Sequence, residues 1–373
     1  MLANADLHIH SPFSIAVSRF MQPGNLLSAC LTKGIQVLGT GDALQPVWQK
    51  SWEPFLENDA GVVIVPQGEI EDQKRVHHLI LAKDLAQFDQ LRDLLEGKCK
   101  SFETSGRPHV YLSGEEIAAA AHEVGAIIGP AHAFTPWTSL YAYFDRVSDC
   151  YGSETIDFLE LGLSADSSYG SDITELYDIP FLTNSDAHSP NPDKLGREFN
   201  RIRLTHCSAK DVLDAIKKGE IAMNAGFFPE EGKYNRTACT RCYTQYSLVE
   251  ATRNNWRCPA DGGIIKKGVS DRAKELSHGS DRPPRPPYIH VLPLAQIIQT
   301  MEHASSPNTK KCRAIYTTFI STFGNEITVL IDTPVPEIRT IHSGVADAIA
   351  ALRNGTVTLH PGGGGKYGTF ALV

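Results

Sequence analysis

The stretch GVVIVPQGEIEDQKRVHHLILA, residues 61–82, contains two short apolar runs, at 61–66 and 78–82, with polar residues between them. Short runs of Val, Ile and Leu predict buried strands. Amphipathic segments with helical spacing separate these runs from three similar ones, at 126–129, 158–161 and 181–183. This alternation predicts an α/β fold with a parallel sheet, either open or closed into a barrel.

Capping residues mark the predicted helices. Ser113, with Glu116 three residues later, has the spacing of a capping box, and Gly125 is placed to end that helix. A second helix is predicted from 208 to 218. Near the C-terminus, the apolar spacing in VLPLAQIIQTM (291–301) and VADAIAALRNG (345–355) predicts two more helices.

Length and composition exclude several classes of protein. At ~100–200 residues per domain, 373 residues predict two or three domains. No apolar run reaches the ~18 residues that span a bilayer, and the start MLANADLHIH lacks the features of a signal peptide. Eight cysteines are too few for a disulfide scaffold. We therefore expect a cytoplasmic protein without a membrane partner, and its net charge of −8 argues at first against nucleic acid.

The charge is distributed unevenly. Residues 1–225 carry a net charge of −13, whereas residues 226–373 carry 17 basic and 12 acidic side chains, a net +5. Within 233–285 the basic side chains outnumber the acidic ones by 11 to 5. We therefore predict three domains with distinct tasks: an acidic α/β domain (1–225), a basic cysteine-containing module (226–282) and a mainly helical domain (283–373).

Histidines and carboxylates cluster where the predicted strands begin or end. In a strand, His8 and His10 of the HxH pair point to the same side, although this pair alone is equally consistent with two surface histidines. In a β/α barrel, side chains at the carboxyl ends of the strands assemble into one site. Imidazole and carboxylate ligands without cysteine suit Zn, Mn or Fe in an open hydrolytic site. The further candidates are Glu69, His77 or His78, His132, Asp186 and His188.

The cysteines of CTRC and RCPADGG are spaced as in a structural zinc ribbon. Cys239, Cys242 and Cys258 supply three thiolates, but Asp261 stands where a fourth cysteine is expected. Either the Asp261 carboxylate completes a zinc site or the fourth ligand is lost. The basic residues around the ribbon suit contact with a phosphate backbone, or they form an ordinary solvated face. They are Arg253, Arg257, Lys266, Lys267 and Arg272.

The motifs DLHIHSPFS, KGIQVLGTGD, GEIE, VHHLILA, PAHAF and NSDAH, in this order, resemble those of the PHP (polymerase and histidinol phosphatase) superfamily. The resemblance implies a distorted β/α barrel with up to three divalent metals (Zn, Mn or Mg). It aligns His77 with the histidine ligand of the family's corresponding strand, and His78 is the alternative. Asp42, in GTGD, is either a ligand, a general base or a turn residue. The implied metal ligands are His8, His10, Glu69, His77, His132, Asp186 and His188.

Together with TACTRCYTQY, CPADGGIIKKGVSDR, RPPYIHVLPL, FGNEITVLI and PGGGGKYG, these motifs resemble the endonuclease Q family along the whole chain. The resemblance implies a DNA repair endonuclease that cuts double-stranded DNA 5′ to deaminated bases (uracil, hypoxanthine, xanthine) or abasic sites. Asp186 and Asp42 are then the candidate catalytic carboxylates. A PHP phosphomonoesterase and a non-catalytic nucleic-acid-binding protein on a PHP scaffold are the alternatives.

An enzyme that reads a base but cuts the backbone is expected to extrude that base into a pocket. The aromatic candidates for stacking are Trp48, Trp137, Tyr141 and Tyr169. The glycine-rich PGGGGKYG lacks the order of a Walker A loop, so we expect no use of ATP; Lys366 is a candidate for gripping DNA instead. A sliding clamp stays open as a partner, although the C-terminus, KYGTFALV, shows no clear clamp motif.

Overall fold

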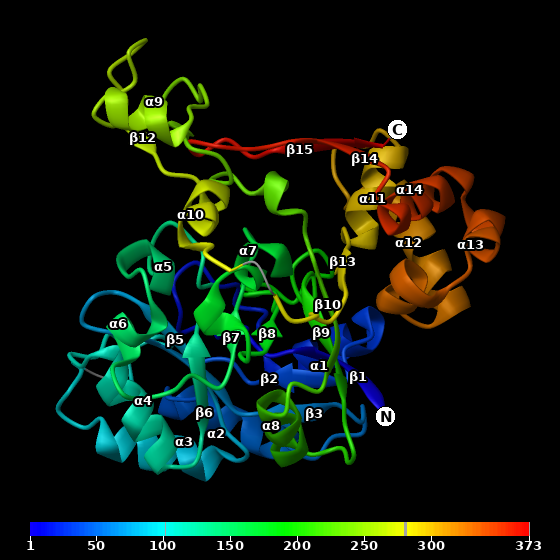
Figure 1. The fold of residues 1–373 in the computed structure, drawn as a ribbon. Coiled ribbons are helices and arrows are strands. Elements are labelled where there is room, and N and C mark those ends of the chain that lie inside the picture. The colour runs from blue at the N-terminus through cyan, green and yellow to red at the C-terminus, as the bar shows by residue number, and fades with distance from the viewer. Residues whose placement is uncertain (101, 280–281, 373) are drawn as a thin grey trace.

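Three sheets form the α/β body, residues 1–231 with the edge strand 288–290, in the computed structural model, which describes residues 1–100, 102–279 and 282–372 (Figure 1). The six-stranded sheet contains, in spatial order, Tyr288–His290 (β13), Ile221–Gly226 (β10), Phe199–Arg203 (β9), Leu2–Asp6 (β1), Val37–Gly39 (β2) and Val63–Val65 (β3). The three-stranded sheet contains Gln67–Glu71 (β4), His77–Leu81 (β5) and Ile127–Pro130 (β6), and the two-stranded sheet contains Leu159–Glu160 (β7) and Phe181–Leu182 (β8).

The predicted strand runs correspond to β3, β5, β6, β7 and β8, but the prediction of a parallel sheet is only partly right. β1, β2 and β3 pair in parallel, as do β7 and β8. In contrast, β9 is antiparallel to both neighbours, and so is β5. The reason at β4–β5 is the short turn between them, in which Asp72 Oδ1 accepts the N–H groups of Lys74 and Val76 at 2.8 Å each. So short a connection joins only antiparallel strands. The fold is therefore mixed α/β.

Helices cover the sheets of the α/β body, and Leu85–Leu94 (α3), Gly114–Glu123 (α4) and Ala209–Lys217 (α8) lie along its lower side in Figure 1. The predicted capping box at Ser113 and Glu116 is present, and Gly125 follows α4 with a φ of 77°. The prediction from 208 to 218 is also confirmed, because Ser208 caps α8. The helices of this body are Pro23–Lys33 (α1), Pro46–Trp52 (α2), Leu85–Leu94 (α3), Gly114–Glu123 (α4), Leu140–Tyr143 (α5), Val147–Tyr151 (α6), Ser167–Ser171 (α7) and Ala209–Lys217 (α8), with short 3₁₀ turns at Glu53–Phe55, Thr174–Leu176 and Pro229–Glu231.

The cysteine module, residues 238–266, projects from the α/β body at the upper left of Figure 1. It holds a two-stranded ladder of Ala238–Cys239 (β11) and Ile265–Lys266 (β12) and the helix Leu248–Arg253 (α9), and Val269–Leu276 (α10) follows it. Its small core consists of Cys239, Ala251, Cys258 and Ile265.

The C-terminal domain is mainly helical, as predicted. Phe319, Ile298 and Ile349 belong to one buried apolar cluster, and Gly355 ends the last helix in a left-handed conformation. None of the helices in 1–100, 102–279 and 282–372 is long and apolar enough to cross a membrane. The helices of this domain are Leu294–Met301 (α11), Lys310–Phe323 (α12), Val335–Ile341 (α13) and Ser343–Asn354 (α14), with a π-helical turn at Thr328–Asp332.

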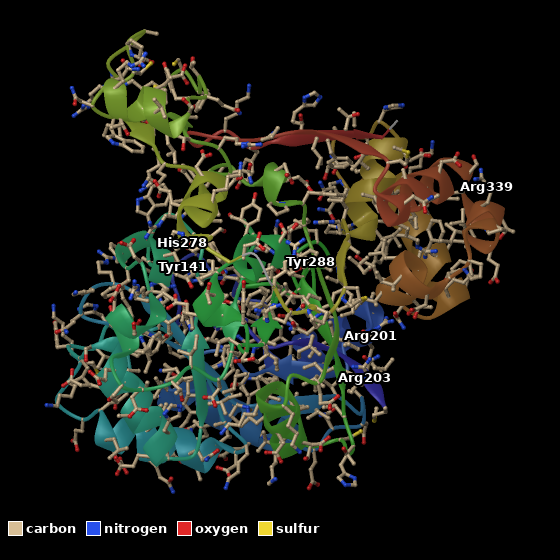
Figure 2. The ribbon with its side chains drawn as sticks, in the orientation of Figure 1. Tyr141, Arg201, Arg203, His278, Tyr288 and Arg339 are labelled. Atoms are coloured by element: carbon tan, nitrogen blue, oxygen red, sulfur yellow. The ribbon has the colours of Figure 1, made fainter. Side chains whose placement is uncertain are left out.

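Buried and bidentate ion pairs fix the helical domain to the α/β body. Lys33 at the end of α1 is 2% exposed, and its Nζ lies 2.7 Å from Glu326 Oε1. On β9, Arg201 donates two 3.0 Å bonds to the carboxylate of Asp332 (Arg201 is labelled in Figure 2). β13, at the end of the proline-rich run 281–288, pairs with β10 in the main sheet. Residue 281 of that run lies outside the described residues.

A glycine hairpin, residues 357–372, joins the helical domain to the cysteine module (red in Figure 1). Its strands are Val357–His360 (β14) and Thr369–Leu372 (β15). At the tip, Gly362 N donates to Glu230 O and Arg236 N donates to Gly362 O, each at 2.9 Å. A Cβ on Gly364 would lie 2.1 Å from the carbonyl oxygen of Cys239. The glycines at 362–364 and 368 therefore dock through their backbone and leave no room for side chains at those positions.

Substituting Gly364 by alanine tests this docking. Gly364 and Gly355 have nearly the same φ, 65° and 66°, but Gly355 has nothing within 4 Å of its added Cβ. Gly355→Ala should cost about 1–2 kcal/mol, the left-handed backbone penalty alone. Gly364→Ala should cost more in urea unfolding and should speed tryptic cleavage after Lys366. Equal effects of the two substitutions would contradict the docking.

Candidate metal centres and the cavity beside them

Glu69 on β4 is a fully buried carboxylate at the centre of the candidate site. Its Oε1 lies 2.9 Å from His77 Nδ1 and 3.1 Å from His132 Nε2, and its Oε2 lies 3.0 Å from Arg107 Nη1. Burial alone would raise the pKa of Glu69, but His77 and Arg107 hold that pKa well below its usual range. Glu69 is therefore an anion at neutral pH.

The topology brings ligands from five strands to one edge. Because β5 is antiparallel to β4 and β6, its first residue, His77, lies beside Glu71 on β4, near the end where β6 leads to His132. β1 leads to His8 and His10, and β8 leads to the segment with Asp186 and His188. A bridge between Ile9 and Ala187 joins these last two segments. His77 therefore joins the site from the start of its strand.

Two buried atoms that could bind a metal ion have no hydrogen-bond partner in this site. His8 Nδ1 contacts the Glu160 carboxylate at 2.9 Å, which leaves Nε2 facing Glu69 Oε1 at 3.8 Å and Asp186 Oδ1 at 3.9 Å. Both His8 Nε2 and Asp186 Oδ1 are buried and have no hydrogen-bond partner. His10 Nε2 is 3.1 Å from Asp186 Oδ1 but is not aligned for a hydrogen bond with it. Imidazole nitrogens and carboxylate oxygens in this arrangement suit the binding of divalent cations.

The protonation of His8 reflects the same crowding of acceptors. Burial alone would lower the pKa of His8, but the carboxylates of Glu160 and Glu69 raise it to about 9. The pKa of His10 is likewise raised well above its usual value, against the effect of burial, by Asp42 and Asp186. A proton on each imidazole thus takes the place that a metal ion can take.

The seven residues implied as ligands all lie together. They form three overlapping groups in which the candidate ligand atoms lie within 4.8 Å of one another. His10 and Glu69 each belong to two groups, so bound ions would be neighbours. The groups are His8, His10 and Glu69; His10, Asp186 and His188; and Glu69, His77 and His132.

Asp42 supports this cluster from behind. Its Oδ1 lies 3.0 Å from His10 Nδ1, and its Oδ2 accepts bonds from Ser11 N and Oγ and from Ser14 Oγ. With both oxygens engaged, Asp42 orients His10. The backbone of Asp42 is left-handed, with a φ of 45°, and so are those of His132 (34°) and Asp186 (47°). Three strained residues at one site are typical of a functional site.

Two residues of the site were not found from the sequence. Glu160 on β7 is buried and accepts bonds from Asn184 Nδ2 at 2.7 Å and from the His132 N–H at 2.8 Å, besides contacting His8. A charged residue in the apolar run 158–161 was the available signal. Arg107 follows no motif, and only the fold brings it to Glu69.

The structure separates the two adjacent histidines and several aromatic candidates. His78 points away from Glu69, and its Nδ1 lies 2.7 Å from Tyr151 Oη.

Trp48 and Tyr141 are each 2% exposed and belong to the core, so the prediction that they stack on a base is wrong (Tyr141 is labelled in Figure 2). Trp137 is 45% exposed.

A cavity of about 720 Å³ opens beside the metal-ligand cluster. One wall carries Arg107 and four of the candidate ligands. Other parts of the wall carry aromatic side chains from three distant segments, and the edge of Trp137 meets Tyr234 at 4.6 Å between ring centres. Tyr169 does not line this cavity. The four candidate ligands in the wall are His77, His132, Asp186 and His188, and the aromatic residues are Trp137, Tyr234 and Tyr367.

The cysteine module brings its four candidate ligands together. Cys239 Sγ lies 3.3 Å from Asp261 Oδ1, and Cys242 Sγ lies 3.6 Å from Cys258 Sγ. A hydrogen bond from Gly263 N–H helps to lower the pKa of Asp261 to about 2. Asp261 is therefore an anion that can serve as an oxygen ligand.

The basic residues of this region divide into two sets. Lys266 lies 4.4 Å from the ring centre of Trp137 and Arg272 pairs with Asp145, so these two side chains contact the α/β body. Lys267 pairs with Glu275 at 2.7 Å, within the segment that follows the module. Arg253 and Arg257 are exposed. The prediction of phosphate contact therefore keeps its basis only for those two.

Comparisons with known proteins agree with this architecture. A PHP-associated family model matches residues 172–221, and the MJ0043 C-terminal domain model matches residues 293–356. The chain is 45% identical over 246 residues to the uncharacterized protein MJ0043 of Methanocaldococcus jannaschii. The match includes 64% of this chain and only 31% of that longer relative.

Two solved structures match along the whole chain. The lesion-specific endonuclease PfuEndoQ from Pyrococcus furiosus is 45% identical, with a TM-score of 0.96, and the alignment covers 100% of this chain and 96% of that one. A complex of endonuclease Q with a 27-mer duplex that has an abasic lesion at the active site is 45% identical, with a TM-score of 0.94 and coverage of 100% and 97%. This chain belongs to the endonuclease Q family.

Proposed function

We propose that this protein is a metal-dependent DNA repair endonuclease that hydrolyses the backbone of double-stranded DNA at damaged nucleotides. The observation that carries the proposal is that two buried atoms without hydrogen-bond partners, His8 Nε2 and Asp186 Oδ1, face each other beside a cavity large enough for a nucleotide. The related endonuclease Q that was crystallised with an abasic duplex supports the choice of substrate.

The metal ligands that we propose are the seven residues of the three groups: His8, His10, Glu69, His77, His132, Asp186 and His188. Divalent ions (Zn, Mn or Mg), when bound, supply Lewis acidity that activates water and neutralises charge on the phosphate. Glu160 and Asp42 hold the imidazoles of His8 and His10 in the tautomers that direct Nε2 into the site. Arg107, which lines the cavity, is placed to bind a phosphate oxygen.

The cavity and the resemblance to endonuclease Q support finer features of the substrate. We infer that the target nucleotide leaves the base stack and enters the cavity, where Trp137 offers an aromatic surface. We infer further that cleavage is 5′ to the lesion and that uracil, hypoxanthine, xanthine and abasic sites are accepted. Arg253 and Arg257 lie exposed on the cysteine module, where they can contact the phosphate backbone of the duplex.

The proposal also assigns the three domains. Residues 1–225 form a distorted PHP-type barrel that is opened into three sheets, residues 226–282 form a zinc ribbon, and residues 283–373 form a helical domain that contacts DNA. A phosphomonoesterase would need neither of the last two domains. A non-catalytic scaffold would not need the full ligand set.

Asp186→Ala should lower the cleavage of uracil-containing duplex by about 100-fold or more, because changes outside the first ligand sphere already cost 10–100-fold. Binding of the duplex should be largely retained. The measurement is single-turnover nicking of labelled duplexes with uracil, hypoxanthine or normal bases in Mg²⁺, Mn²⁺ or Zn²⁺, with a phosphomonoester in parallel.

Asp59→Ala, an exposed acidic position, is the matched control. Full cleavage by Asp186→Ala would reject the ligand assignment. With the unsubstituted protein, release of phosphate alone would favour the phosphomonoesterase, and bound but uncut DNA would favour the non-catalytic scaffold.

The stability of the metal-free protein should fall as the pH rises, whereas the stabilisation by bound metal should rise. In the metal-free protein, protonated His8 has a folded-state pKa of about 9, above the usual 6.5. Its contribution to stability is complete below about pH 6.5 and is lost as the pH rises towards 9. Metal must displace these protons, so metal affinity should rise across the same window. Thermal unfolding at pH 6.5–9, with chelator or with Mn²⁺, measures both trends; parallel trends would contradict the assignment.

Asp261→Cys should tighten zinc in the cysteine module, because thiolate replaces a weaker oxygen ligand at the fourth position. We expect zinc release to a chromogenic chelator to slow by about tenfold or more, which corresponds to about 1.4 kcal/mol. Asp261→Ala should release zinc faster than the unsubstituted protein. Identical release from all three proteins would show that Asp261 is not a ligand.

A further inference from the structure

The loop of residues 11–20 exposes large apolar side chains next to a polar site. Ile15 is 86% exposed, Phe20 is 56% exposed and Phe13 is 36% exposed. The loop follows directly after the candidate ligand His10. Exposed apolar groups that gather beside a binding site indicate contact with a partner.

This apolar loop, residues 11–20, is held firmly in place. Ser14 Oγ donates to Asp42 Oδ2 at 2.9 Å, Gly106 N donates to Phe13 O at 3.0 Å, and Ser18 N donates to His188 O at 2.8 Å. Val17 packs against the buried cluster that contains Met21. The exposed side chains therefore sit on a fixed support rather than on a free loop.

The apolar loop also lies close to the reacting centre. Ser18 N donates to His188 O at 2.8 Å, and Ile15 is three residues away, so the Ile15 backbone lies within roughly 14 Å of that carbonyl oxygen. The guanidinium of Arg19 lies over the ring of Phe20, 5.1 Å from its centre. An apolar tip with a cation beside it suits the stacked bases and flanking phosphates of a duplex better than an apolar protein surface.

We propose that the apolar loop is a wedge that enters the base stack of duplex DNA, with Ile15 and Phe20 occupying the space that the damaged nucleotide leaves. The inference rests on the proposed function. A nucleotide that moves into the cavity leaves a gap in the stack, and apolar side chains inserted between base steps offset the lost stacking. Arg19 then lies where it can contact a phosphate next to the gap.

The test compares two duplexes with the same lesion, one fully paired and one with the lesion inside a small mismatched bubble, where no stack has to be opened. Ile15→Ala/Phe20→Ala should lower kcat/KM on the paired duplex by about tenfold and should leave the bubble duplex nearly unchanged. Leu31→Ala, at an exposed apolar position on α1, should change neither.

A second measurement needs no cleavage. With chelator present, 2-aminopurine opposite the lesion should brighten on binding of the unsubstituted protein and brighten less with the double variant. Equal losses on both duplexes, no loss on either, or unchanged brightening would overturn the wedge. If the unsubstituted protein cuts neither duplex, the proposed function fails, and the fluorescence measurement still decides the wedge.

Discussion

A single buried negative charge organises the site. Glu69 has no exposed surface, yet its carboxylate lies within 4 Å of nitrogens from His8, His10, His77, His132 and Arg107. An isolated carboxylate at such a depth would be strongly destabilising, so the fold is constrained to deliver cationic or metal-binding partners around it. The remaining carboxylates, Glu160 and Asp42, serve this arrangement by fixing the imidazoles.

The backbone bears part of the cost of that arrangement. Asp42, His132 and Asp186 all have positive φ angles, and such conformations cost of the order of 1–3 kcal/mol each. Each of the three residues follows a strand of a different sheet: β2, β6 and β8. The sheets supply the rigidity that holds these residues in place, and the ion pairs of Lys33 and Arg201 extend it to the helical domain.

The sequence allowed the elements and most of the cluster to be predicted, but not their pairing. Capping at Ser113 and Ser208 depends on local hydrogen bonds, which neighbouring residues reveal. The antiparallel direction of β5 depends on the short turn at Asp72, whose geometry a pattern of apolar residues does not contain. Arg107 reaches Glu69 only through tertiary structure, and Trp48 and Tyr141 are buried because packing, not residue type, decides exposure.

The glycine hairpin determines which of its own positions can diverge. An added Cβ at Gly362, Gly363, Gly364 or Gly368 would in every case come within 2.9 Å of a carbonyl oxygen of the segment 230–239. Lys366 and Tyr367 carry their side chains away from that docking surface, and Tyr367 reaches the cavity. Homologous chains can therefore alter the chemistry at this rim through those two positions while the surrounding glycines stay fixed.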